Sequence, residues 1–216
     1  MRLLTVGTAA LLLAAAASAA RANAFDADLS LGYSQLRIDG PNAKDLDKRD
    51  GFGAQFSFMF PAPKTPSFRY GFGLNASGFR NDFHVFDPDR GREVHRFDEF
   101  SLIVPELRIG YYIPIDHFFI EPSVGLGLAV GDYSTGRVHH HHHHDDDDVN
   151  DDFDDVDTST VRLNAAVHPT IQVGYGYEHW AVGLEASYLY THLHFKEGIG
   201  GDIGELYTGV FFRFSY

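Results

Sequence analysis

The sequence contains no cysteine, so disulfide bonds cannot stabilise it in an oxidising compartment. Beyond residue 24 it also lacks any apolar run near the roughly 18 residues that a membrane-spanning helix needs. Positive charge is scarce: 17 Lys and Arg face 30 Asp and Glu, which gives a formal net charge of −13. These absences exclude a disulfide scaffold and a membrane helix after residue 24, and the acidic balance argues against nucleic acid as a partner.

The first 24 residues have the pattern of a secretory signal peptide. A short basic start is followed by an apolar, alanine-rich stretch over residues 3–20 and by an A-x-A cleavage pattern at residues 22–24. A transmembrane anchor is the alternative, but the stretch is short for a span and a good cleavage site follows it. We therefore expect residues 1–24 to be removed during export and residues 25–216 to form the mature domain.

The last fourteen residues, 203–216, alternate with a period of two. Their even positions are mostly apolar and include Leu206, Val210 and Phe212, whereas their odd positions include Glu205 and Arg213. This alternation predicts a β-strand whose two faces meet different surroundings. Because the apolar face is bulky and aromatic, we interpret it as facing lipid and the polar face as lining a lumen. An open sheet edge is not tolerated in hydrocarbon, so the chain must supply a closed barrel.

Seven earlier segments show related alternation, and the connections between segments are alternately long and short. The segments lie near residues 25–38, 51–60, 68–77, 97–113, 118–130, 161–175 and 180–191, and the long connections near 39–50, 84–96, 136–158 and 196–202. Short periplasmic turns and long external loops are typical of outer-membrane barrels. We therefore predict an all-β fold, an antiparallel up-and-down transmembrane barrel of eight strands with both termini on the periplasmic side. A soluble β-sandwich is the alternative.

One of these segments departs from clean alternation. Around residues 102–104 the sequence Leu-Ile-Val is continuously apolar, although the second half of the same segment alternates. A bulge or a change of register is the usual cause of such an interruption. We expect one here, at a position that the sequence does not define.

The inward positions of the predicted strands carry charged residues of both signs in equal number. A closed interior requires such a balance because an unpaired buried ion costs several kcal/mol. An eight-stranded barrel is also only wide enough for side chains to fill its interior. We predict a lumen plugged by an ion-pair network, with a proton or ion path as the functional alternative. The network consists of Arg69, Glu106, Arg108, Glu121, Arg162, Glu185, Glu205 and Arg213.

These features together resemble the small outer-membrane barrels of the OmpA/OmpX type. The resemblance rests on the signal peptide, the eight alternating segments, the charged lumen and the terminal aromatic Tyr216, with Phe212 and Phe214 at two-residue steps before it. It covers essentially the whole mature chain and identifies no subfamily. It implies residence in the outer membrane among lipid and lipopolysaccharide, and insertion by the barrel-assembly machinery, which reads the C-terminal strand. No peptidoglycan-binding domain follows the last strand, so tethering to the cell wall is not implied.

The third long connection carries an unusual run of histidine and aspartate. Neutral imidazole suits Zn²⁺, Ni²⁺ and Cu²⁺, and a surrounding acidic field concentrates cations. We therefore hypothesise that this external loop binds divalent transition metals, namely Zn²⁺, Ni²⁺ or Cu²⁺. Apart from such a metal ion, we expect no cofactor. No D-x-[DN]-x-[DN]-G calcium loop is present. The candidate ligands are His139, His140, His141, His142, His143, His144, Asp145, Asp146, Asp147 and Asp148.

Three other interpretations stay open. Charge blocks are often passive solvated loops, in which case the barrel has a structural or adhesion role. The run also resembles an affinity tag with a protease site, although Val149 stands where that site would need Lys. A lipid A-modifying enzyme would need a nucleophile and a base at the outer rim. His192 and His194 lie there without a close Ser/His/acid arrangement in the sequence, so we expect no enzyme activity.

Overall fold

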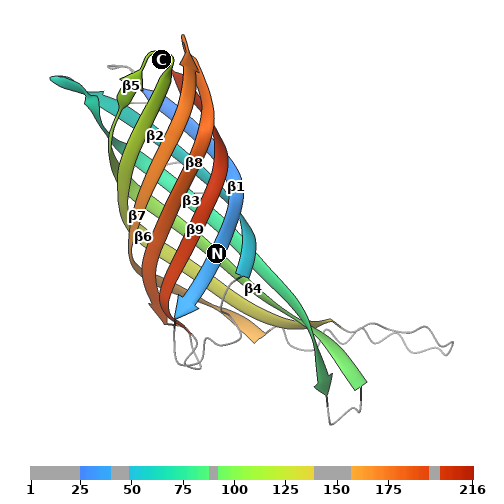
Figure 1. The fold of residues 1–216 in the computed structure, drawn as a ribbon. Helices are drawn as coiled ribbons and strands as arrows, with labels where there is room; N and C mark the ends of the chain where they lie inside the picture. Colours follow the sequence, from blue (N-terminus) through green and yellow to red (C-terminus); the bar gives the residue numbers. More distant parts are fainter. Residues whose placement is uncertain (1–24, 40–48, 88–91, 139–156, 195–199) are drawn as a thin grey trace.

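The structure is a computed structural model that describes residues 25–39, 49–87, 92–138, 157–194 and 200–216, which form one antiparallel sheet (Figure 1). β5 is a short continuation of β4 beyond Tyr112, because both pair with β6. Eight long strands therefore make the wall, as the sequence predicts. The strands are β1 Asp26–Asp39, β2 Arg49–Ala62, β3 Thr65–Asp87, β4 Arg92–Tyr111, β5 Ile113–Ile115, β6 Phe118–Val138, β7 Asp157–Tyr177, β8 Trp180–His194 and β9 Gly200–Ser215.

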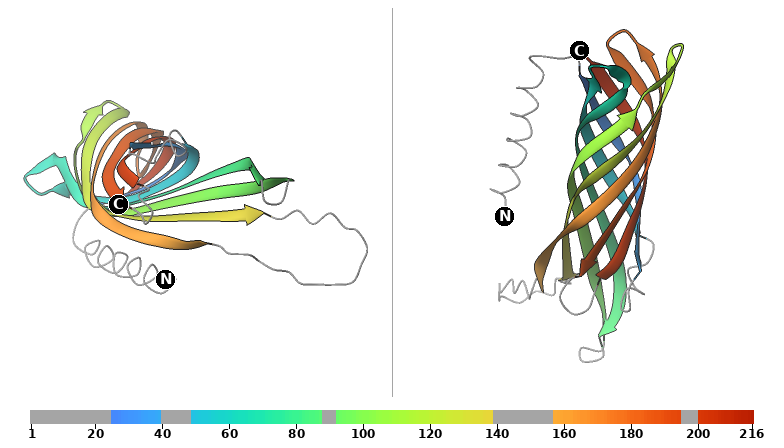
Figure 2. Two further views of the ribbon diagram at one scale, coloured as in Figure 1. Left: turned by 90° about the horizontal axis from the view of Figure 1, so that it is seen from below. Right: turned by 90° about the vertical axis from the view of Figure 1, so that its left-hand side faces the viewer.

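The sheet closes on itself and forms a ring. The strand order β4-β3-β2-β1-β9-β8-β7-β6-β5 becomes a ring through the additional pairing of β4 with β6, and the ring is visible end-on in Figure 2. β1 and β9 pair in a register that sets Ala27 against Phe214. Phe25 N donates to Tyr216 O at 3.1 Å, and Tyr216 N donates to Phe25 O at 3.0 Å. The predicted up-and-down barrel requires the first strand to pair with the last, and this pairing is confirmed.

The outer surface of the wall is a belt of large apolar side chains. Leu184 is 68% exposed and Leu107 is 62% exposed, although both sit in regular strands. A continuous apolar belt of this kind is the surface that a transmembrane barrel offers to hydrocarbon. Further members are Leu29, Leu31, Phe52, Ile109, Leu126, Leu163, Ile171, Val210 and Phe212.

No helix in the described part of the chain is long and apolar enough to span a membrane.

The two ends of the barrel differ in their connections. Two-residue turns at 63–64, 116–117 and 178–179 join strands at the end where the C-terminus lies, which we call the inner end. Asp116 and Glu178 adopt positive φ angles of 56° and 52° in two of these turns. The strand ends that flank residues 40–48, 88–91, 139–156 and 195–199 lie at the opposite, outer end.

The prediction of a loop over residues 84–96 is wrong. β3 continues to Asp87 and β4 begins at Arg92, and these two residues pair with each other. The hairpin projects beyond the ring (Figure 2). A strand that has left the hydrocarbon can carry polar residues, so the polar composition that suggested a loop is compatible with a ribbon.

The prediction of a bulge or a change of register around residues 102–104 is also wrong. The pairs Ile103↔Val130 and Glu106↔Gly127 belong to one register between β4 and β6, and the pairing of β3 with β4 continues without a shift. Leu102 and Val104 are both buried inside the barrel. The apolar run therefore reflects an apolar lumen at this level, and the strand itself is regular.

Candidate functional site

Arg213 on β9 lies at the centre of the inner part of the lumen. Its Nε and Nη2 donate to the two carboxylate oxygens of Asp28 at 2.7 and 2.8 Å, and its Nη1 donates to Glu121 at 2.7 Å. Nη2 also donates to Gln172 Oε1 at 2.7 Å, and the guanidinium carbon lies 4.8 Å from the centre of the Phe119 ring. Such two-pronged contacts fix geometry as well as charge. Arg213 thereby links four strands across the barrel interior.

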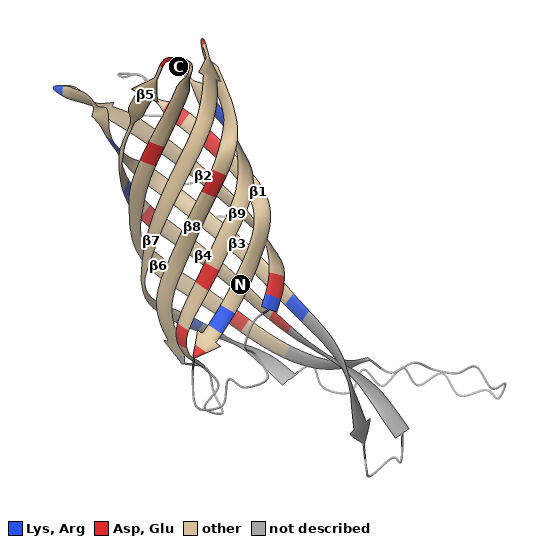
Figure 3. Cartoon of the chain, viewed as in Figure 1, with Lys and Arg blue, Asp and Glu red and all other residues tan. Residues whose placement is uncertain are grey.

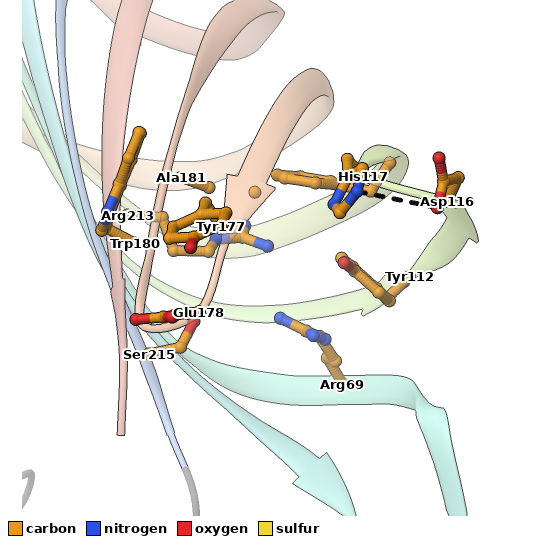
Figure 4. A pocket seen from close by; sticks show the side chains of 12 residues that line it. Arg69, Tyr112, Asp116, His117, Tyr177, Glu178, Trp180, Ala181, Arg213 and Ser215 are labelled. Carbon is orange, nitrogen blue, oxygen red and sulfur yellow. Dashed lines mark ion pairs between the residues drawn. The ribbon is translucent and has the colours of Figure 1, made fainter.

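Arg69 occupies the inner mouth, next to this cluster. It forms an ion pair with Asp26, lies 3.6 Å from Glu121, and stacks 4.1 Å from the centre of the Tyr112 ring. A cavity of about 190 Å³ opens here, and Figure 4 shows Arg69 and Tyr112 facing it from one side and His117 from another. Because Arg69 and Arg213 are both paired with carboxylates, the cavity mixes charges of both signs and selects no particular ligand class.

A second cluster surrounds Glu106 in the middle of the lumen. Arg108 donates to its Oε1 through Nε at 3.0 Å and Nη2 at 2.6 Å, and His168 Nδ1 lies 2.9 Å from its Oε2. Glycine makes room for this carboxylate, because a Cβ added to Gly125 would lie 2.2 Å from Glu106 Oε2. The side chains fill the interior at this level, as expected for eight strands.

Two further carboxylates are held by uncharged donors. Glu185 accepts a hydrogen bond from Gln172 Nε2 at 2.6 Å. Glu205 accepts hydrogen bonds from the hydroxyls of Ser34 and Ser77 at 2.8 and 2.9 Å. Buried polar groups are tolerated when they are hydrogen-bonded. Both oxygens of Glu205 accept a bond, whereas Oε1 of Glu185 has no hydrogen-bond partner among the described residues. Among the described residues, buried carboxylates outnumber buried arginines. Hydroxyl and amide groups therefore donate hydrogen bonds to carboxylates that have no arginine bonded to them.

The structure places most of the predicted lumen residues inside the barrel. Arg162 is the exception: it lies near the outer end of β7 and is exposed. Sequence reasoning also omitted Asp26, Asp28 and His168 from the charged network, although the first two occupy the polar face of the first strand. The seven predicted residues inside are Arg69, Glu106, Arg108, Glu121, Glu185, Glu205 and Arg213 (charged positions along the strands are marked in Figure 3).

An apolar cluster fills the lumen beyond these charges, toward the outer end. Its members are at most 3% exposed, and the Phe79 and Phe100 rings lie 6.1 Å apart. On β1 the change is abrupt, from Ser34 in the polar part to Leu36 in the apolar part. An ion crossing the barrel would have to pass both a filled polar layer and a filled apolar layer. The cluster consists of Leu36, Ile38, Phe79, Phe100, Leu102, Val104, Ala129, Ala166, Leu189, Leu193 and Ile203.

The outside of the barrel at this level is polar near the outer ends of β8 and β9. His192 Nδ1 lies 2.7 Å from Asp202 Oδ1, and both side chains are about half exposed. Thr191, beside His192 in sequence, points inward and donates its hydroxyl to the Ala165 carbonyl at 2.9 Å. Ser187 is likewise buried inside, where its hydroxyl accepts a hydrogen bond from Gln55. These two hydroxyls therefore lie on the opposite face of the wall from His192.

The predicted metal ligands, residues 139–148, lie outside the described residues. They fall between Val138, where β6 ends, and Asp157, where β7 begins, and both strand ends are at the outer end. Within the described part of the chain, no three His, Cys, Asp or Glu side chains are grouped so as to hold a metal ion.

Comparison with known proteins agrees with the architecture. No protein-family model matches the sequence, and no curated protein matches it. The crystal structure of neisserial surface protein A, NspA, superimposes with a TM-score of 0.52 at 12% identity, covering 90% of this chain and 99% of that chain. Ail, the attachment invasion locus protein of Yersinia pestis, gives 0.49 at 14% identity over 88% and 99% of the two chains.

The outer membrane protease OmpT of Escherichia coli gives a TM-score of 0.49 at 9% identity, covering 89% of this chain and 97% of that chain. At these identities the similarity concerns the fold alone, and the match to NspA supports it. The ring of eight long strands and the apolar belt lead to the same result independently. The chain is an eight-stranded β-barrel of the outer-membrane type, and it resides in the outer membrane.

Proposed function

We propose that this protein is a non-conducting outer-membrane barrel whose connection between β6 and β7 binds divalent transition metals at the cell surface. The main support is the filled lumen, in which the clusters around Arg213 and Glu106 are followed by an apolar cluster. With the interior closed, ligands outside the cell can meet only the outer surface and its connections. The barrel then serves as a rigid scaffold for those connections.

The sequence of this connection supplies the chemistry. Six consecutive imidazoles at residues 139–144 offer several nitrogen ligands to one ion, and the aspartates at residues 145–148 add negative charge beside them. Nitrogen ligands favour Zn²⁺, Ni²⁺ and Cu²⁺ over Mg²⁺ and Ca²⁺. The net charge of −13 attracts cations to the surface before any ligand is engaged.

Titration calorimetry on the refolded barrel tests this function. The wild type, a variant lacking residues 139–148, a variant with the six histidines replaced by Asn, and a variant with the four aspartates replaced by Asn are each titrated with Zn²⁺, Ni²⁺ and Cu²⁺. We expect the deletion and the histidine variant to lose binding, because they lack the nitrogen ligands. The aspartate variant should bind more weakly, because only the attracting field is reduced.

The control is a variant with His192 replaced by Gln, which removes an exposed imidazole elsewhere at the outer end. It should bind metal as the wild type does. Unchanged binding after deletion of residues 139–148, or affinity only in the millimolar range, contradicts the proposal. That result would leave a passive hydrophilic loop on a structural or adhesion-type barrel.

A further inference from the structure

Two histidines stand opposite each other in the β3–β4 hairpin, which projects beyond the ring (Figure 2). The pairing of the two strands sets His84 against His95. Directly opposite residues of an antiparallel pair lie on the same face of the sheet, with Cβ atoms about 4.5–5.5 Å apart. In the strand pairings of the described residues, no other position sets two histidines against each other. The hairpin therefore holds two histidines at a fixed spacing on one face.

The register also brings this pair to the beginning of the histidine run. On its other side β4 pairs with β6, and there His95 stands opposite Val138. Val138 is the last residue of β6, and His139 follows it in sequence. Opposite Cα atoms of an antiparallel pair lie about 4.5–5.5 Å apart, and one further residue adds at most about 3.4 Å. The histidine run therefore begins within reach of the pair.

The two faces of the sheet differ in charge at this level. At the register position next to His95 and Val138, Arg96 stands opposite Arg137. Successive residues of a strand lie on opposite faces, so these two arginines share the face away from the histidine pair. Two cationic residues there make that face unfavourable for a metal ion. The register therefore separates a face with two nitrogen ligands from a face that repels cations.

We propose that His84 and His95 supply two fixed nitrogen ligands to the divalent transition metal bound by the connection between β6 and β7. This inference rests on the function proposed above. Histidine nitrogens bind Zn²⁺ at about 2.0–2.1 Å, so two of them on one tetrahedral ion lie about 3.3 Å apart. Opposite positions in a sheet are close enough for that separation. A closed zinc site needs four ligands, so the histidines at residues 139–144 supply the others.

Ligands fixed by strand pairing raise affinity by more than their number alone provides. A residue whose position is set by a sheet loses little conformational freedom when it binds a metal ion, and this saving increases the affinity. The pair also defines a place for the ion, beside β4 and next to the end of β6. The inference therefore predicts one preferred metal position on the barrel, and it predicts that this position depends on both His84 and His95.

Titration calorimetry with Zn²⁺ tests the two ligands. The refolded barrel carries His84→Asn, His95→Asn or both substitutions, and gel mobility confirms that each variant is folded. We expect each single variant to bind Zn²⁺ about tenfold more weakly, the lower end of the loss seen when a group that supports a metal ligand is removed. The double variant should be little weaker than either single variant, because the pair acts as a unit. Val94→Asn is the matched control: it introduces the same residue one position away, on the opposite face, and should leave the affinity unchanged.

A distance measurement tests the position of the ion. The chain has no cysteine, so Ser101→Cys provides a unique site for a nitroxide label. Ser101 is exposed and lies on β4, six residues from His95, which corresponds to roughly 20 Å along the strand. With one equivalent of Cu²⁺, pulsed electron paramagnetic resonance should give a narrow distance distribution near this value. The distribution should become broad when both His84 and His95 are replaced by Asn. A broad distribution with the two native histidines would overturn the inference.

Deletion of residues 139–148 separates this inference from the proposed function. If the deletion abolishes Zn²⁺ binding while the His84 and His95 variants bind as the wild type does, the inference is wrong and the proposed function stands. If binding survives the deletion but is lost in the His84 and His95 variants, the proposed function is wrong and the pair itself is the metal site. Binding that survives in all of these variants would overturn both.

Discussion

The inner and outer parts of one lumen are filled in opposite ways. Toward the inner end the filling is polar, and the guanidinium of Arg213 is engaged by Asp28, Glu121 and Gln172. Toward the outer end it is apolar, and Phe100 and Leu36 are fully buried among other apolar side chains. The difference follows from what surrounds the wall. Where the outer face of the wall is an apolar belt, the polar residues point inward. Farther out on β1, β4 and β8 the outer face is polar, and the apolar residues point inward and form a core, as in a soluble barrel.

Substitutions in the two parts of the lumen are expected to destabilise the barrel for different physical reasons. A buried ion pair adds little net stability over apolar packing, but removal of one partner leaves a costly unpaired charge. In an apolar core, truncation of a side chain loses the transfer free energy of the deleted atoms and leaves a cavity. Substitutions that are matched across the two parts can therefore separate the two kinds of filling.

The largest loss of folded protein is expected from a deletion that prevents the barrel wall from closing around both parts of the lumen. Deletion of residues 214–216 removes the inner end of the pairing between β1 and β9, including the two hydrogen bonds between Phe25 and Tyr216. We expect almost complete loss of folded, heat-modifiable barrel in a refolding assay read by gel mobility. Deletion of residues 139–148 is the control and should leave most of the barrel folded. Equal loss in the two variants would contradict the division between scaffold and external segment.

In the polar part, Arg213→Met should be strongly destabilising. Met fills a similar volume but leaves the carboxylates of Asp28 and Glu121 without their cation, at a cost of about 3–5 kcal/mol. Urea unfolding of the refolded barrel, followed by the fluorescence of the single tryptophan, Trp180, measures this cost. The double variant Arg213→Met with Asp28→Leu should recover part of the loss. No recovery would argue that Arg213 acts through packing rather than charge pairing.

In the apolar part, Leu102→Ala should cost about 2–4 kcal/mol, because it leaves a cavity among side chains that are almost fully buried. Leu107→Ala is the matched control on the same strand, since Leu107 is 62% exposed on the outer face. Its removal creates no enclosed cavity, so the cost should be clearly smaller in the same urea experiment. If both variants lose the same free energy, the outer lumen is not a packed core.

The smallest effect is expected for an arginine that belongs to neither kind of filling. Arg162 is exposed, so Arg162→Met should change the unfolding free energy by no more than about 0.5 kcal/mol. It matches Arg213→Met in chemistry and differs from it in location. A loss comparable to that of Arg213→Met would show that Arg162 is a member of the buried network after all.

The sequence predicts the architecture well because alternation reports directly on the two faces of a strand. The strand positions, the alternation of short and long connections, and the pairing of β1 with β9 in a closed barrel all follow from the period-two patterns and the polar stretches between them. The polar lumen is also predictable where the outer face is apolar, because Glu106 and Arg108 alternate along β4 with the exposed Leu107 and Ile109.

Alternation does not report which solvent each face meets. The prediction assumed polar residues inside along the whole strand, and this assumption suggested a bulge at residues 102–104. Arg162 is in the same alternation as the buried His168, but it is exposed because it lies beyond Ala166, where the pairing of β7 with β8 stops. The exchange of polar and apolar residues between the two faces is visible on the first strand, where Leu36 and Ile38 continue the series of Asp28 and Ser30. Its interpretation requires the positions of the strands relative to the membrane. Partners such as Ser77 for Glu205 lie far apart in sequence and depend on the register of the closed ring.

Single-channel recording in planar lipid bilayers tests the closed lumen most directly. The purified wild-type barrel is reconstituted, and current is recorded in 1 M salt over a wide voltage range, with an open porin as the positive control. Because a filled polar layer and an apolar layer lie in series, the account predicts no steady conductance from the folded, heat-modifiable protein. Steady, voltage-independent current steps from that protein would contradict it.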